Sequence, residues 1–106
     1  PVRAVEILRP WIAYTHAKDG LHHRDCDAEQ VYDAFARGGF EQLQKETGLL
    51  FEETPLGAGS VDFPSYLRAL NAAGFDGYLT IERETGADPD IRLAVDFLKN
   101  QIHNLK

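Results

Sequence analysis

The chain has 106 residues, enough for one small domain, and its 43% apolar and 26% charged residues are typical of a globular rather than a disordered protein. The formal net charge of −6 argues against nucleic acid or an anionic membrane as partner, because both require clustered Lys and Arg. No apolar run approaches the roughly 20 residues of a membrane span, and no secretory signal is visible. Cys26 is the single cysteine, which excludes an internal disulfide, so we expect a cytoplasmic protein.

A helix and a strand are predicted at the start of the chain. Residues 1–9 place apolar side chains on one face of a short helix, which Pro10 ends. Residues 11–16, with the sequence WIAYTH, are apolar and rich in aromatic and β-branched types, which favours a strand. Residues 17–27 are predicted to form a loop.

Short helices are predicted in the middle of the chain. Residues 28–37 carry apolar side chains at helical spacing, and Asp27 is suited to cap the first turn. The glycine pair at 38–39 breaks this helix, and residues 40–47 form a second short one that stops at a further glycine. Residues 49–60 are expected to be irregular.

The last part of the chain is predicted as helix, strand and helix. A helix over residues 63–73 begins after Asp62, which can cap it. Residues 78–83, with the sequence YLTIER, form the second strand, and Gly86 turns the chain. Asp88 and the proline after it are expected to cap and begin the last helix. The apolar stripe expected on that helix consists of Ile91, Val95, Leu98 and Ile102.

This order of elements predicts an α/β fold. Strands that alternate with helices pair in parallel through right-handed crossovers. The two predicted strands are nearly continuous in apolar character, as expected of strands covered on both faces. Parallel α/β proteins carry their chemistry at the carboxyl ends of such strands.

The second predicted strand ends in charged residues. The alternation of side chains along a strand predicts which face each residue occupies. Leu79 and Ile81 share one face, which we expect to meet helices. Tyr78, Thr80 and Glu82 share the other face, which we expect to look into a barrel or cleft.

The same alternation places Ile12, Tyr14, His16 and Lys18 on one face of the first strand. If the two parallel strands are neighbours about 4.8 Å apart, His16 and Glu82 meet at one rim. An imidazole and a carboxylate are both ligands of first-row metals. From these residues alone, a structural hydrogen bond or ion pair is as good an interpretation as a metal site.

Three segments, read together, resemble a known family. THAKDG at 15–20, PLGAGSVDFPSYLRAL at 55–70 and GFDGYLTIERE at 74–84 follow the order seen in the sugar phosphate isomerase/epimerase family. The resemblance spans about residues 1–99. It implies parallel strand–helix units that form the C-terminal part, about strands seven and eight, of a (β/α)8 xylose isomerase-like TIM barrel. Residues 1–106 would then be a single partial domain with a small helical insertion at about 24–53.

The resemblance also implies a site and a reaction. His16 and Glu82 would be metal ligands for manganese, magnesium, cobalt or zinc, and Glu82 would also move a proton next to a substrate carbonyl. Lys18 would meet an oxygen of a sugar or sugar-phosphate substrate, although a solvated surface lysine is an equal alternative. The family's remaining ligands, a Glu and an Asp, lie on earlier strands.

Those earlier strands are not in this sequence, which contains no methionine and begins at Pro1. We therefore expect a C-terminal portion of an enzyme that is inactive by itself. Its open sheet edges predict a homo-oligomer or pairing with the missing barrel strands. One rival hypothesis is a non-catalytic, self-associating half-barrel module. Another is an endonuclease IV-like zinc nuclease, which would need a basic groove and an Asp-x-His pair.

Other polar and glycine positions are predicted to serve the structure. Asp19 suits a loop cap or a lysine partner better than a catalyst. Gly57 and Gly59 resemble a phosphate loop but lack a following Gly-Lys-Ser/Thr, and we interpret them as turn positions. Arg83 points away from Glu82 by alternation and is expected to pair with a helix acid.

Overall fold

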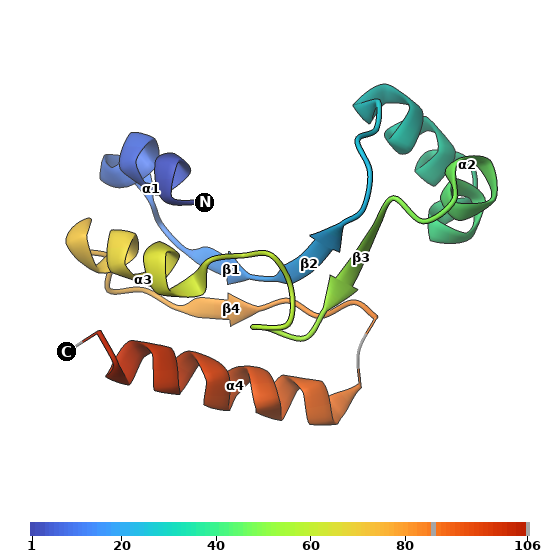
Figure 1. Cartoon of the computed structure of the whole chain (residues 1–106). Coiled ribbons are helices and arrows are strands. Elements are labelled where there is room, and N and C mark those ends of the chain that lie inside the picture. Colours follow the sequence, from blue (N-terminus) through green and yellow to red (C-terminus); the bar gives the residue numbers. More distant parts are fainter. Residues whose placement is uncertain (86, 106) are drawn as a thin grey trace. The chain divides into compact units, whose positions relative to one another are not determined.

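A computed structural model describes residues 1–85 and 87–105 (Figure 1). The chain divides into two compact units, the first made of Pro1–Gly20 with Glu53–Lys106 and the second of Leu21–Glu52. The elements in chain order are α1 (Val2–Leu8), the 3-10 helix η1 (Arg9–Trp11), β1 (Thr15–Ala17), β2 (Asp19–His22), α2 (Ala28–Thr47), β3 (Phe51–Thr54), α3 (Phe63–Ala72), β4 (Leu79–Ile81) and α4 (Asp88–His103).

The first unit is built on a parallel pair of strands, β1 and β4, as predicted. Thr15 lies opposite Leu79 and Ala17 opposite Ile81 in this pair. Helix α3 connects the two strands in sequence and contacts both α1 and α4. The helices therefore lie in the order α1, α3, α4 beside the strands, which is the arrangement of strand–helix units in an open piece of a parallel barrel.

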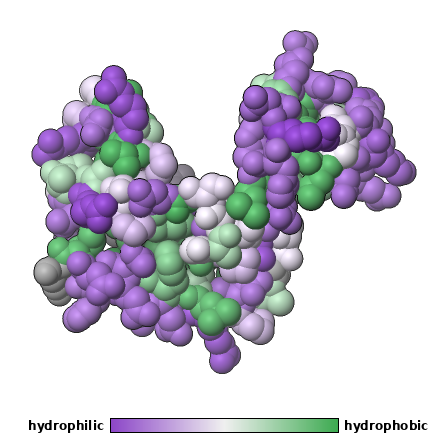
Figure 2. Space-filling view, viewed as in Figure 1, coloured by the Kyte–Doolittle hydropathy of each residue, from purple (hydrophilic) through white to green (hydrophobic). Residues whose placement is uncertain are grey.

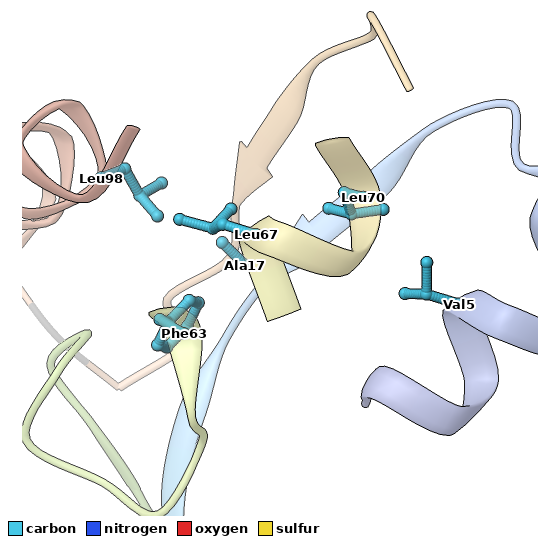
Figure 3. Packing of buried hydrophobic residues seen from close by; sticks show 6 residues of the cluster. All are labelled: Val5, Ala17, Phe63, Leu67, Leu70 and Leu98. Carbon is cyan, nitrogen blue, oxygen red and sulfur yellow. The ribbon is translucent and has the colours of Figure 1, made fainter. Parts of the chain in front are cut away.

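The core of this unit lies between the helices and the strands (Figure 3). Its buried members are Val5, Ala17, Phe63, Leu67, Leu70 and Leu98. Leu79 and Ile81 pack against them, whereas Tyr78 is 86% exposed, so the aliphatic face of this strand meets the helices as predicted. Ile12 also packs against the core and does not share the exposed face of Tyr14. The prediction failed there because residues 12–14 are not part of a regular strand, and alternation does not extend through them.

Local signals set the bounds of α3. The carboxylate of Asp62 accepts a hydrogen bond from the backbone N–H of Ser65 at 3.0 Å, which confirms the predicted cap. Hydrogen bonds from the Ser65 side chain and backbone lower the pKa of Asp62. The helix ends at Ala72, and Gly74 follows at a φ of +74°, a backbone conformation that favours glycine.

Helix α4 differs from its prediction at its start and on its buried face. Asp88 is its first residue rather than its cap, and the N-cap position belongs to Ala87, which offers no side-chain acceptor. The predicted turn at residue 86 lies outside the described residues. Ala94 and Leu98 are buried, but Ile91 and Ile102 are 38% and 41% exposed. Leu98 confirms the predicted stripe and Val95 is half-buried, so the buried face overlaps the predicted one but is shifted toward Ala94.

Two strands appear where loops were predicted. Residues 17–27 contain β2, residues 49–60 contain β3, and these two strands pair in a second two-stranded sheet. The predicted strand at 11–16 also begins later, because Arg9–Trp11 form a 3-10 turn around Pro10. Strands as short as β2 and β3 carry too few apolar residues for alternation to reveal them.

The second unit is a bent helix with a small core of its own. Asp27 caps α2 by accepting from the N–H of Glu29, as predicted. The helix is kinked at Gly38 and at Gly39, where φ is +66°. Arg37 bonds to Glu46 across the kink at 2.6 Å and, with Gln42, lowers the pKa of Glu46 to about 2. Three residues, Ala34, Leu43 and Leu50, form the core of this unit.

Across residues 1–85 and 87–105, no helix combines the length and the apolar character that crossing a membrane would require.

Candidate functional site

Strands β1 and β4 bring His16 and Glu82 together. Nδ1 of His16 lies 2.8 Å from Oε2 of Glu82. The pairing register explains this contact: His16 lies opposite Thr80, and the N–H of Glu82 continues the ladder by donating to the carbonyl of Ala17 at 3.1 Å. The two side chains are 50% and 34% exposed. They therefore meet, partly exposed, at the carboxyl ends of adjacent parallel strands.

Lys18 lies among carboxylates at the same rim. Its Nζ is 3.0 Å from Glu82 Oε1 and 2.7 Å from Glu84 Oε1. These hydrogen bonds, the one to Glu84 foremost, raise the pKa of Lys18. The Lys18 ammonium, followed by the His16 ring, lowers the pKa of Glu82. The rim thus carries an ionised Glu82 beside a charged lysine at neutral pH.

Glu53 is an organising residue of the rim that the sequence did not reveal. Its side chain is only 8% exposed. It accepts hydrogen bonds from the backbone N–H groups of Glu84 and Thr85, at 3.0 and 2.8 Å, and from Arg83 Nη1 at 2.9 Å. Burial by itself would raise the pKa of Glu53, but hydrogen bonds from Thr85, Glu84 and Arg83 lower it to about 2. Glu53 stood in a segment predicted to be irregular, and no periodic signal marks it.

Asp19 fixes a second loop beside the rim. Its side chain is buried, with the residue 3% exposed. Its two oxygens accept from the backbone N–H groups of Gly57 at 2.9 Å and of Gly59 and Val61 at 3.1 Å. Asp19 also accepts from the N–H of Gly20 at 2.9 Å, so the expected loop cap is present and serves four backbone donors. Gly57 has a φ of +87°, and a Cβ at Gly59 would collide with the Asp19 carboxylate, so both glycines are turn positions, as predicted.

Arg83 leaves the rim and ties β4 to the helix layer. Its Nη1 lies 2.9 Å from Glu53, and its Nη2 lies 3.2 Å from Asp90 of α4. This is the pairing with a helix acid that alternation predicted for Arg83. Because Glu82 points the opposite way, the two neighbouring residues serve different sides of the strand.

The rim offers an imidazole nitrogen and a carboxylate oxygen, two donor types that divalent first-row metals accept. The donor set is a partial one. In the part of the chain that the structure describes, no group of three or more His, Cys, Asp and Glu side chains is placed to hold a metal ion. Within the described residues, His16 and Glu82 therefore supply two donors and not a complete metal site.

The family model for the xylose isomerase-like TIM barrel matches residues 2–101. The chain belongs to the xylose isomerase-like TIM barrel family. A solved structure similar to it is the xylose isomerase domain protein from Planctomyces limnophilus, with 26% sequence identity and a TM-score of 0.64. That match covers 95% of this chain but 29% of the P. limnophilus protein, so the chain spans less than a third of that relative's length. No curated protein matches the chain.

Membership of the xylose isomerase-like family confirms the predicted fold class. The parallel strands and their helices are a part of a TIM barrel, and the described residues do not close one. The rim that holds His16, Lys18 and Glu82 is the carboxyl end of the strands, where barrel enzymes carry their active sites.

Proposed function

We propose that this rim belongs to a divalent-metal-dependent sugar or sugar-phosphate isomerase or epimerase, and that the 106-residue chain is inactive without the rest of a barrel. The observation that carries the proposal is the 2.8 Å approach of His16 to Glu82 at the ends of adjacent parallel strands. Family membership supports the reaction class, because the fold is one that hosts sugar isomerisation.

Each of the three rim residues has a role in this reaction. His16 and Glu82 would hold the metal, which when bound would polarise the substrate carbonyl. The Glu82 carboxylate is ionised and exposed enough to accept a proton from the carbon next to that carbonyl. The Lys18 ammonium would bind a substrate oxygen, and its bonds to Glu82 and Glu84 hold it at the rim.

The remaining requirements explain why we propose inactivity for this chain alone. Proton abstraction next to a carbonyl needs stabilisation of the charge that develops on the oxygen, and two ligands hold a metal ion weakly. The P. limnophilus relative carries more than two thirds of its length outside the match, and further ligands would come from such a segment.

The metal site can be tested by following the histidine ring signals of the chain by NMR during addition of Mn²⁺. The second unit offers a matched control, because His23 Nε2 lies 3.1 Å from Glu52 Oε1 with similar exposure. We expect Mn²⁺ to broaden the signal of His16 at lower concentration than that of His23, and Glu82→Gln to remove this preference. Equal broadening of both rings, or a preference that survives Glu82→Gln, would contradict the proposed site.

A further inference from the structure

Three carboxylates surround the ammonium group of Lys18 at the rim. Its Nζ lies 3.0 Å from Glu82 and 2.7 Å from Glu84. A third carboxylate, that of Glu53, lies 3.7 Å away. Proteins hold phosphate groups with cations whose charge is free to pair with the phosphate oxygens. The charge of Lys18 is already more than offset by its neighbours, so the rim is left with an excess of negative charge.

The backbone donors that follow β4 are occupied as well. In parallel barrels a phosphate group frequently binds to the loops after the seventh and eighth strands. The family resemblance gives β1 and β4 about these two positions. Directly after β4, the N–H groups of Glu84 and Thr85 both donate to the buried carboxylate of Glu53, at 3.0 and 2.8 Å. An internal carboxylate therefore fills the place in which these amides could receive a phosphate oxygen.

The start of α4 is equally unsuited to an anion. The first turn of a helix attracts anions because its N–H groups have no partners within the helix. The first turn of α4 carries two acidic residues, Asp88 and Asp90. Asp90 also pairs with Arg83 at 3.2 Å, and the other end of that guanidinium binds Glu53 at 2.9 Å. The helix terminus and the arginine that follows Glu82 are thus both engaged with carboxylates.

The loop before α3 shows the same arrangement. Successive backbone N–H groups that point into one concavity form a common cradle for phosphate. In this loop the N–H groups of Gly57, Gly59 and Val61 converge on one acceptor, but that acceptor is the buried carboxylate of Asp19. A phosphate group would have to displace Asp19 to use them.

The charge of the whole chain acts in the same direction. The formal net charge is −6, and Figure 2 shows hydrophilic residues over much of the visible surface. A negative field lowers the local concentration of anionic ligands and slows their association. An uncharged ligand does not meet this barrier.

The groups that disfavour phosphate are suited to hydroxyl groups. A carboxylate only accepts hydrogen bonds and an ammonium only donates them, whereas a hydroxyl does both. Neighbouring hydroxyls of a sugar can therefore donate to Glu84 and accept from Lys18, whose side chains are 52% and 38% exposed. A phosphate dianion offers acceptors alone and would face the carboxylates without a donor between them.

We propose that the rim takes an unphosphorylated sugar, and that Glu84 together with Lys18 recognises its hydroxyl groups and rejects phosphate esters. This inference rests on the proposed function, because it concerns the substrate of the same site. It narrows the substrate from a sugar or sugar phosphate to the uncharged class, and it adds Glu84 to the residues that face the substrate.

The experiment titrates the 106-residue chain, without metal, with fructose and separately with fructose 6-phosphate at constant ionic strength. NMR follows the amide signals of Lys18 and Glu84. The variant Glu84→Gln removes one carboxylate from Lys18 while the backbone N–H at this position keeps its acceptor, Glu53. The matched control is Glu41→Gln, which changes the net charge equally at a side chain of the second unit that is 85% exposed.

We expect fructose to shift the rim signals of the wild type at concentrations no higher than those that fructose 6-phosphate requires. Glu84→Gln should improve the affinity for fructose 6-phosphate relative to fructose by about fivefold or more, because one repulsive charge is gone. Glu41→Gln should leave this ratio unchanged. Tighter binding of fructose 6-phosphate than of fructose by the wild type, an unchanged ratio in Glu84→Gln, or rim signals that neither sugar shifts would overturn the proposal.

These outcomes are separate from those of the Mn²⁺ experiment. The response of His16 to Mn²⁺ tests whether the rim binds a metal ion, whereas the sugar titration contains no metal and tests which charge the rim accepts in its ligand. A rim that binds Mn²⁺ at His16 but prefers fructose 6-phosphate would leave the proposed function standing and reject this inference alone.

Discussion

Asp19 binds the backbone of Gly57 across 38 positions of the chain, with 2.9 Å between its Oδ2 and the amide nitrogen. The same carboxylate reaches Gly59 and Val61 and thereby fixes the loop that leads into α3. One buried side chain therefore satisfies backbone donors that would otherwise lie without partners beside the rim.

Replacing Asp19 with alanine is expected to destabilise the chain strongly. The substitution leaves several backbone N–H groups of a buried loop without an acceptor, and we expect the free energy of unfolding to fall by about 3 kcal/mol. Urea denaturation followed by circular dichroism measures the change. The control is Asp76→Ala at an exposed position, which should stay within about 0.5 kcal/mol of wild type. A loss at Asp19 no larger than at Asp76 would show that the loop does not depend on this carboxylate.

Glu53 should make stability depend on pH in the acid range. Its pKa is about 2 in the folded chain against an ordinary value of 4.5, so the folded state holds the carboxylate ionised. A lowered folded pKa adds stability above pH 4.5, and this contribution is lost as the pH falls from about 4.5 to about 2. Glu53→Gln lacks the ionisable group and should show a shallower decline in that window, measured by urea unfolding at several pH values.

The comparison for Glu53 is Glu41→Gln, whose side chain is 85% exposed and which should follow wild type. A stability difference between Glu53→Gln and wild type that stays constant from pH 7 to pH 2 would contradict the assignment.

Two glycines with similar backbone angles should respond differently to alanine. Gly57 and Gly74 have φ values of +87° and +74°, so alanine is strained at both by about 1 kcal/mol. At Gly57 the added Cβ would also lie 2.6 Å from the ring of Phe97, whereas at Gly74 it meets nothing within 4 Å. We expect Gly57→Ala to lower the melting temperature clearly more than Gly74→Ala. Equal shifts would mean that Phe97 moves aside freely.

Much of the first unit could be predicted because its signals are local. Asp62 before α3 and the alternation of Leu79 with Tyr78 depend on neighbouring residues, and the structure has both as expected. The meeting of His16 and Glu82 followed from alternation together with parallel pairing. The roles of these two residues in binding and catalysis stay predictions.

The features that the sequence did not reveal depend on contacts between distant segments. Strands β2 and β3 are stabilised by pairing with each other, and neither is long enough to show an alternating apolar pattern in the sequence. Glu53 is defined by donors some thirty positions away, among them Thr85 and Arg83. The sequence predicts Asp88 as the N-cap of α4 because a proline follows it. In the structure the N-cap is Ala87, one residue earlier, so Asp88 lies in the first turn of the helix.

The two buried carboxylates also bear on how this protein can vary. Asp19 and Glu53 stand on the strands where the chain leaves for, and returns from, the second unit, and both are fastened within the first unit. The two chain segments that flank residues 21–52 are thus each held by hydrogen bonds within the first unit. We therefore expect changes in sequence or length within residues 21–52 to leave the backbone that carries His16, Lys18 and Glu82 in place.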